Sequence, residues 1–416
     1  MRLRSFQLAR AVAAIAVVCI HVDMALKYVD AAGVHLPALL RFGYAGVDVF
    51  FIISGFIISM ALSHSPGAWD FVWRRVIRIV PIYWLTTALW LAMLKGSHRT
   101  LPGAGELVAS FLILPLRQFP ALGVGWSLEH EVLFYALVAV LLIAGRIRHA
   151  QAVLAGACLV GVVVHSLQPA VLGTEPWDFH VFSLYNFDFL AGTFIFQHRK
   201  ALATVHWKPC LALSLMLFVA AGWWMEKLYG GHIPTQPEGW SGLARVLSLC
   251  AAGSLLLIGL MSMEALRPEL LEGRMSRGLQ RIGDASYSLY LTHLLVFAVI
   301  SFGLSKAHLG AAWAWPLSLA SVLAAIAFAI AWYDHVELPL IDRIKRLVPS
   351  SRASQAARRD AHAADPRAAS AAAASGLEAD PVGALHEVNP RAAANPDAPT
   401  AKAMPMPSTA QVGAIE

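Results

Sequence analysis

The chain has 416 residues, of which 58% are hydrophobic and only 14% charged, and its formal net charge is +6. A mean hydropathy of +0.60 excludes an ordinary soluble domain and indicates an all-α, polytopic membrane protein. The cysteines stand singly in or beside apolar runs, so they suggest neither a disulfide framework nor a metal site.

Charge-poor stretches long enough to cross a bilayer, which takes about 17–25 residues, recur along the chain. They predict about ten transmembrane helices, at residues 8–26, 42–62, 79–94, 124–144, 152–167, 181–196, 211–225, 243–261, 285–304 and 313–332. A shorter apolar stretch at 106–114 fits an interfacial or re-entrant segment better than a further crossing.

Basic residues are distributed unequally between the loops and predict the orientation. Most lysines and arginines fall on one side when the N-terminus is placed in the cytoplasm, and the C-terminus then lies there too. The same asymmetry accounts for the net positive charge, so no nucleic-acid partner is implied.

The composition changes after Pro349 to Ala, Pro, Arg, Asp and Ser with almost no aromatic residues. Such a segment cannot bury enough apolar surface to offset the entropy lost on ordering. We therefore expect a membrane-embedded domain at residues 1–348 and a disordered cytoplasmic tail at residues 349–416.

The first predicted helix carries two ionisable residues, Arg10 and His21. Eleven steps of about 100° return a helix to within roughly 20° of its starting direction, so both project from one face, roughly 16 Å apart. Ionisable groups inside a span mark a functional site. The alternative is that Arg10 reaches lipid phosphates and His21 is a hydrogen-bonded interior histidine.

The second predicted helix places Asp48 in its outer third, at a depth similar to that of His21 on the preceding helix. A hydrogen bond between them would fix the tautomer of His21 and raise its basicity. Alternatively, Asp48 caps its helix and faces water.

Ionisable residues also open the fourth predicted helix. Glu131 lies one to two turns in from the outer surface and approaches the level of His21, after Trp126 and Ser127. Glu129 and His130 are nearer the surface, where solvation is the simpler expectation.

Two arginines precede the third predicted helix. Arg75 and Arg78 are neighbours on one helix face and, with Arg10, would form a basic cluster suited to phosphates. Lipid headgroups could equally satisfy such arginines. On the later helices, His293 is as consistent with a structural role as with a ligand contact, and Glu337 predicts a structural ion pair with these arginines.

Five motifs occur in one order along the chain. They are Arg10 with His21, Gly46-Val47-Asp48 with Ser54-Gly55-Phe56, Arg75 and Arg78 with Tyr83-Trp84, Trp126-Ser127-Leu128 with Glu131 and Tyr135, and Ser286-Tyr287-Ser288 with His293. Together they resemble the acyltransferase 3 family of integral membrane acyltransferases, and most closely its exopolysaccharide-modifying branch. The likeness covers about residues 4–344.

The resemblance implies an O-acyltransferase of the bacterial inner membrane. It would move an acyl group, expected to be acetyl, from cytoplasmic acyl-coenzyme A to a hydroxyl of a surface or secreted polysaccharide or its lipid-linked precursor. Two other classes stay open, a transporter or flippase of a lipid-linked or acidic solute and a signalling protein whose tail recruits partners. An acyltransferase acting on a small molecule is a further possibility.

The resemblance also implies roles for Arg10, His21, Arg75, Arg78 and Glu131, and the other residues of the groups below are expected from their place on the predicted helices. The catalytic group would comprise His21, Asp48 and Glu131, with His21 acting as a general base or through transient acylation. The donor-binding group would comprise Arg10, Arg75, Arg78, Tyr83 and Trp84. The acceptor-binding group would comprise Trp126, Ser127, Tyr135 and His293. No metal is implied.

Overall fold

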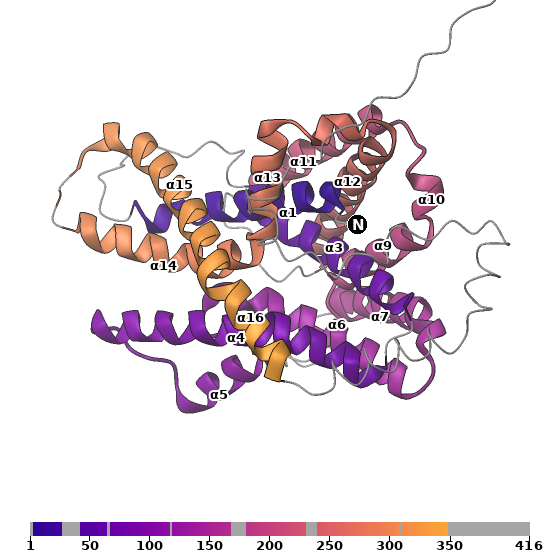
Figure 1. Ribbon diagram of the computed structural model, residues 1–416, viewed down its shortest axis with the longest axis horizontal. Helices are drawn as coiled ribbons and strands as arrows, with labels where there is room; N and C mark the ends of the chain where they lie inside the picture. Colours follow the sequence, from indigo (N-terminus) through magenta and orange to yellow (C-terminus); the bar gives the residue numbers. More distant parts are fainter. Residues whose placement is uncertain are drawn as a thin grey trace, which may run out of the picture. The chain divides into compact units, whose positions relative to one another are not determined.

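A computed structural model describes residues 3–26, 42–64, 67–116, 119–167, 180–229, 239–305, 307 and 309–347. The regular elements within these residues are helices, which confirms the predicted all-α class (Figure 1). The predicted tail, residues 349–416, lies outside the described residues.

Nine stretches of the described chain are long and apolar enough to cross a membrane. They contain the helices α1 (Arg4–Ile20), α3 (Ala45–Leu62), α4 (Ala68–Gly96), α6 (Trp126–Ile143), α7 (Ala150–Leu167), α11 (Trp207–Tyr229), α12 (Gly239–Leu266), α14 (Ser286–Leu304) and α15 (Ala314–Trp332). Shorter helices are α5 (Ala104–Leu112), α9 (Asn186–Gln197), α10 (Arg199–Leu202), α13 (Arg274–Asp284) and α16 (Leu338–Leu347).

The remaining predicted crossing, residues 181–196, contains the shorter helix α9, which has 12 residues. A side chain competes with helix formation just before it, since the hydroxyl of Ser183 accepts the backbone N–H of Tyr185 at 3.2 Å. Aromatic pairs show that α9 runs parallel to α3: Phe51 lies 4.7 Å from Phe189 and Phe56 lies 5.3 Å from Phe196, between ring centroids. This short helix therefore accompanies α3 through part of its depth.

Two glycines let α3 and α9 approach closely. A Cβ on Gly192 would overlap the carbonyl oxygen of Ile52, and one on Gly55 would overlap that of Phe189. Small residues at such contacts let helix backbones pack closely in membrane proteins. The close packing of α3 against α9 therefore requires glycine at positions 55 and 192.

We predict that Gly192→Ala destabilises the protein by about 1–3 kcal/mol, the usual cost of overpacking. Gly156→Ala is the matched control, because a Cβ on this α7 glycine meets open space and should stabilise the helix by roughly 0.5–1 kcal/mol. Thermal unfolding of both variants in detergent measures the difference. Equal unfolding temperatures for the two would contradict the close α3–α9 contact.

The helix α1 packs against α3, α12, α13 and α14. Its alanines allow close approach, with Ala9, Ala13 and Ala14 at most 1% exposed. The glycines of α3 and of the turn before it complete this contact: a Cβ on Gly46 would overlap the carbonyl oxygen of Ala13. These contacts fix the depth and the rotation of α1 in the bundle.

A closed series of helices surrounds the interior. In the order α1, α3, α6, α4 and α14, each helix contacts the next, and α14 contacts α1 again. The helix α16 crosses α4 (Figure 1), and a π-helical turn, Tyr333–Glu337, connects α16 to α15. π-Helical turns are frequent at functional sites. Side chains from this series form the candidate site described next.

The helix α4 begins at Ala68, about three turns earlier than the predicted span at 79–94. Hydropathy marks only the lipid-spanning part of a helix, and the arginine-rich turns before it contribute no apolar signal. Arg75 and Arg78 therefore lie on the helix itself. The predicted interfacial stretch at 106–114 contains α5, whose nine residues are too few for a crossing.

Candidate active site

Arg10 of α1 and His21, the residue directly after the end of α1, both contact α14. The Nε of Arg10 donates to the hydroxyl of Ser286 at 3.0 Å. The Nδ1 of His21 lies 3.3 Å from the Nε2 of His293, and the two rings are 5.0 Å apart between centroids. His293 is fully buried and His21 is half-buried. The predicted face of α1 therefore lies along α14, with the arginine and the histidine at two separate contacts.

The hydrogen bonds of His21 indicate its tautomer. Its Nδ1 lies 2.9 Å from the carbonyl oxygen of Val17, and the Nδ1 of His293 lies 3.0 Å from that of Leu289. Because a carbonyl only accepts, both Nδ1 atoms carry the proton in the neutral rings. The Nε2 of His21 then holds a lone pair, which is the state that a general base requires.

Asp48 is not the partner of His21, contrary to the prediction. The contact of Gly46 with Ala13 places this part of α3 beside a point eight residues before His21, about 12 Å along α1. Asp48 follows Gly46 by two residues, roughly 200° around the helix, so it faces away from α1. Its carboxylate lies 4.0 Å from the Nη2 of Arg245 on α12, and both side chains are buried.

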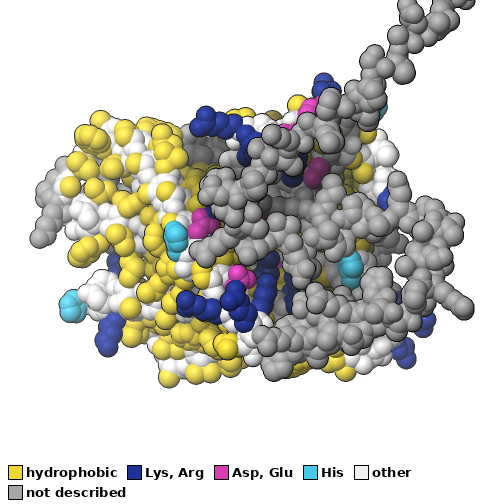
Figure 2. Space-filling view, viewed as in Figure 1, with side chains coloured by type: hydrophobic (Ala, Val, Ile, Leu, Met, Phe, Trp, Pro, Cys, Tyr) yellow, Lys and Arg dark blue, Asp and Glu magenta, His cyan; other side chains and the backbone are white. Residues whose placement is uncertain are grey.

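Arg10 belongs to a cluster of charges inside the helix series. The charges of Arg78, Glu337 and Glu131 act on its guanidinium. Glu337 accepts a hydrogen bond from Ser288 at 2.5 Å. In the space-filling view, basic side chains gather beside acidic ones over α4 and α16 (Figure 2). This part of the site therefore combines Arg10 and Arg78 with two carboxylates, those of Glu131 and Glu337.

Glu131 joins this cluster rather than the histidine pair. Its Oε1 accepts hydrogen bonds from Ser54, at 2.5 Å, and from the hydroxyl of Tyr135. Arg75 lies over the ring of Tyr135, with its guanidinium carbon 5.8 Å from the centroid. Ser54 is near the middle of α3, so Glu131 is deeper than the level expected for His21. Tyr135, expected near the acceptor, also lies here.

Tyr83 and Trp84, which the prediction grouped with the arginines, project from α4 in different directions. Tyr83 is buried, and a Cβ on Gly125 would lie 2.9 Å from its hydroxyl, so it packs at the start of α6. Trp84 is 46% exposed and donates its ring N–H to the carbonyl of Phe111 at 2.7 Å. Tyr83 and Trp84 project in different directions because adjacent residues of a helix differ by about 100° around its axis.

Ser127 is hydrogen-bonded to Tyr290, whose ring packs beside His293. The hydroxyl of Tyr290 donates to the carbonyl of Val124 at 2.8 Å and lies 2.7 Å from the hydroxyl of Ser127. The ring of Tyr290 is 6.3 Å from that of His293, between centroids. Trp126 is half-buried and contacts the ring of Tyr185 at 5.7 Å. Trp126 and Ser127 are the first two residues of α6.

Glu129 and His130 are buried, at 1% and 3% exposure, and are not the solvated residues expected from the sequence. The Nε2 of His180 lies 2.7 Å from the Oε2 of Glu129, and the ring of His180 is 4.5 Å from that of His130. His180 comes from a segment distant in sequence, so local spacing gives no sign of this group.

Arg245 was also missed, although a signal was available. It is an arginine inside the apolar stretch of α12 and is 3% exposed. Its Nη2 donates to the hydroxyl of Tyr185 at 3.0 Å. Asp48 and Asp188 of α9 interact electrostatically with each other, and each also interacts with the positive charge of Arg245. An intramembrane arginine implies a buried acidic partner.

These features define a polytopic membrane protein with ionisable side chains gathered inside its helix bundle. Residues 3–333 match the acyltransferase domain of the acyltransferase 3 family, and the chain belongs to this family of membrane acyltransferases.

It is 33% identical over 336 residues to the exopolysaccharide production protein ExoZ of Rhizobium meliloti (strain 1021). That alignment covers 76% of this chain and 95% of the relative. No solved structure matches the chain. Within the described part of the chain, no group of three or more His, Cys, Asp or Glu side chains could hold a metal ion.

Proposed function

We propose that this enzyme moves an acetyl group from cytoplasmic acyl-coenzyme A to a hydroxyl of a surface or secreted polysaccharide, or of its lipid-linked precursor, at the bacterial inner membrane. The likeness to ExoZ, named as an exopolysaccharide production protein, supports a polysaccharide acceptor. The two contacts between α1 and α14, Arg10 with Ser286 and His21 with His293, carry the proposal.

The arginines supply the donor end of this site. Arg10, Arg75 and Arg78 offer planar guanidinium groups that bind phosphates by forked hydrogen bonds. Coenzyme A is rich in phosphate, and its thioester arm would extend along α1 toward His21, roughly 16 Å from Arg10. A transfer from one side of the membrane to the other then needs no movement of the whole donor.

His21 supplies the base at the acceptor end. Its Nε2 takes the proton of the acceptor hydroxyl while the hydroxyl oxygen attacks the thioester carbonyl carbon. A carbon–oxygen bond forms, the carbon–sulfur bond breaks, and the proton passes to the departing thiolate. In the alternative relay, Nε2 first attacks the thioester carbonyl carbon, the carbon–sulfur bond breaks, and the thiolate leaves as the thiol with the proton from Nδ1. The acceptor hydroxyl then attacks the acyl-imidazole, the carbon–nitrogen bond breaks, and the hydroxyl proton returns to the ring. His293 would orient the ring in either route.

Two assays test the proposal. Surface polysaccharide from cells with and without the gene should differ by one ester, which would identify the acyl group and the acceptor. The purified protein should release free coenzyme A from acetyl-coenzyme A when acceptor is present. Transport of an unmodified solute without an acylated product would contradict it.

We predict that Arg78→Gln raises the KM for acyl-coenzyme A by about 10–100-fold, because a hydrogen bond to a charged group contributes roughly 1.5–3 kcal/mol. Arg74→Gln is the matched control: Arg74 is also exposed on α4 but does not act on Arg10. Initial rates over a range of donor concentrations measure both. Equal KM values for the two variants would remove Arg78 from the donor site.

A further inference from the structure

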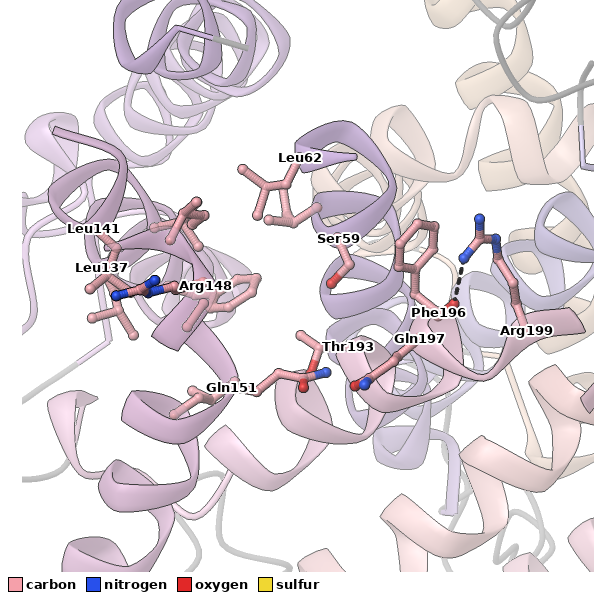
Figure 3. Close-up of a pocket in the computed structure, with 16 residues that line it drawn as sticks. Ser59, Leu62, Leu137, Leu141, Arg148, Gln151, Thr193, Phe196, Gln197 and Arg199 are labelled. Carbon is pink, nitrogen blue, oxygen red and sulfur yellow. Dashed lines mark hydrogen bonds between the residues drawn. The ribbon is translucent and has the colours of Figure 1, made fainter. Parts of the chain in front are cut away.

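A cavity of about 460 Å³ opens between the ends of α3, α6, α7 and α9, outside the charge cluster described above (Figure 3). It lies between the last turns of α3, α6 and α9 and the first turn of α7, which are on the predicted cytoplasmic side. The volume is within the range of ligand sites, roughly 300–1,000 Å³.

The walls of the cavity suit a hydrocarbon chain. Ile58, Leu137 and Leu154 are among its apolar lining residues. The two hydroxyls that line it already donate within the protein: Ser59 to the carbonyl of Gly55 at 2.9 Å and Thr193 to that of Leu190 at 2.7 Å. The lining also contains two amides, that of Gln151, which donates to Thr193 at 3.3 Å, and that of Gln197, which is exposed.

The rim of the cavity is basic. Arg148, from the turn before α7, and Arg199, at the start of α10, approach it from two sides (Figure 3). The side chain of Arg199 is held in place, since its Nη1 donates to the carbonyl of Phe196 at 3.0 Å and its guanidinium stacks over that ring at 4.2 Å. None of the described residues that line the cavity is acidic.

The geometry points to a binding site for an anionic phospholipid of the inner leaflet, with its headgroup at the basic rim that Arg148 and Arg199 form and one acyl chain in the cavity. Basic pockets between transmembrane helices on the cytoplasmic side bind anionic lipid headgroups. The cavity has a basic rim and an apolar interior, which is the same sequence as the charged headgroup and the acyl chain of a phospholipid.

Acyl-coenzyme A carries phosphates too, but its arm is a poorer fit to this cavity. That arm contains amide groups, and a buried amide without a hydrogen-bond partner is costly. The hydroxyl protons of Ser59 and Thr193 are already used, and the amide of Gln151 already donates to Thr193 at 3.3 Å, which leaves the exposed Gln197 at the edge of the cavity as the other amide of the lining. The lipid site is therefore separate from the proposed donor site at Arg10.

The test uses the full chain, washed free of lipid in detergent and titrated with phosphatidylglycerol or phosphatidylcholine, with bound lipid counted by native mass spectrometry. The Arg148→Gln/Arg199→Gln double variant should bind phosphatidylglycerol about tenfold or more weakly, because it loses two charge-assisted contacts. The control, Arg146→Gln/Lys200→Gln, removes the same charge from the same two loops at residues outside the lining. It should bind as the wild type does.

A second variant tests the slot itself. Leu141→Trp places a larger side chain in the lining and should weaken the binding of both lipids equally, whereas the arginine variant should weaken that of phosphatidylglycerol, which has a net negative charge, more than that of the zwitterionic phosphatidylcholine. Equal phosphatidylglycerol binding by the wild type and the arginine variant would overturn the proposal. Binding of coenzyme A that depends on Arg148 and Arg199, without lipid binding, would overturn it as well. Neither readout depends on acyl transfer.

Discussion

Replacement of His21 by alanine is expected to lower the rate of acyl transfer by about 10²–10⁴-fold, the usual contribution of a general base. The protein should remain folded, because the His21 side chain is half-buried and its loss leaves the small-residue contacts of α1 with α3 unchanged. The loss should appear in kcat, since the imidazole acts on the acceptor proton and does not hold the donor phosphates.

The measurement is acylated glycan formed per molecule of purified enzyme, at saturating acetyl-coenzyme A. His64→Ala is the control, because His64 is exposed and also bonds a backbone carbonyl, that of Met60 at 3.1 Å. It should retain full activity. Full activity in His21→Ala would rule out both the general base and the acyl-histidine relay.

The same variant distinguishes the two routes. With labelled donor and no acceptor, a relay predicts one labelled acyl group per wild-type molecule and none in His21→Ala. General-base catalysis predicts no label in either protein. His293→Gln should lower the rate less than His21→Ala, since His293 contacts the His21 ring and not the reacting atoms.

Helix periodicity was enough to predict that Arg10 and His21 project from one face of the first helix. Both residues lie on one face because eleven residues nearly complete three turns. In the structure that face contacts α14 at Ser286 and at His293. The identity of the partner helix was not predictable, because the periodicity of a single helix contains no information on which neighbour covers its face.

The residues around Asp48 could not be predicted from the sequence, for a similar reason. Its depth was expected from the order of the helices, but its direction depends on which face of α3 packs against α1. That choice is made by Gly46, whose missing side chain admits the Ala13 carbonyl. Once Gly46 faces α1, Asp48 must face α9 and α12. Arg245, the single arginine within the apolar stretch of α12, was the available clue to its partner.

The Glu129–His180 pair shows a different limit. Position along a helix gives distance from its end, which led to the expectation of solvated side chains at Glu129. Whether that end is buried depends on which other segment packs over it. Here the segment contains His180, which is fifty-one residues from Glu129 in the sequence. Hydropathy along the chain does not record such long-range cover.

Arg245→Met is expected to have the largest effect on stability, about 3–5 kcal/mol, the usual result of removing one member of a buried ion pair. Asp48 and Asp188 would then stay buried without their cation, and Tyr185 would lose a hydrogen bond. Arg267→Met is the matched control, because Arg267 follows α12 directly but is exposed and pairs with Glu269. It should cost less than about 1 kcal/mol.

The yield of folded protein and its unfolding temperature in detergent measure both changes. A second substitution, Asp48→Asn with Arg245→Met, should recover part of the loss, because it removes one of the carboxylates left without a cation. Since the Gly46 contact holds this part of α3 about two turns of α1 from His21, the recovered protein should still transfer acyl groups. A double variant that is as stable as Arg245→Met alone would mean that Asp48 is not the ion-pair partner. One that is folded but inactive would return Asp48 to the catalytic group.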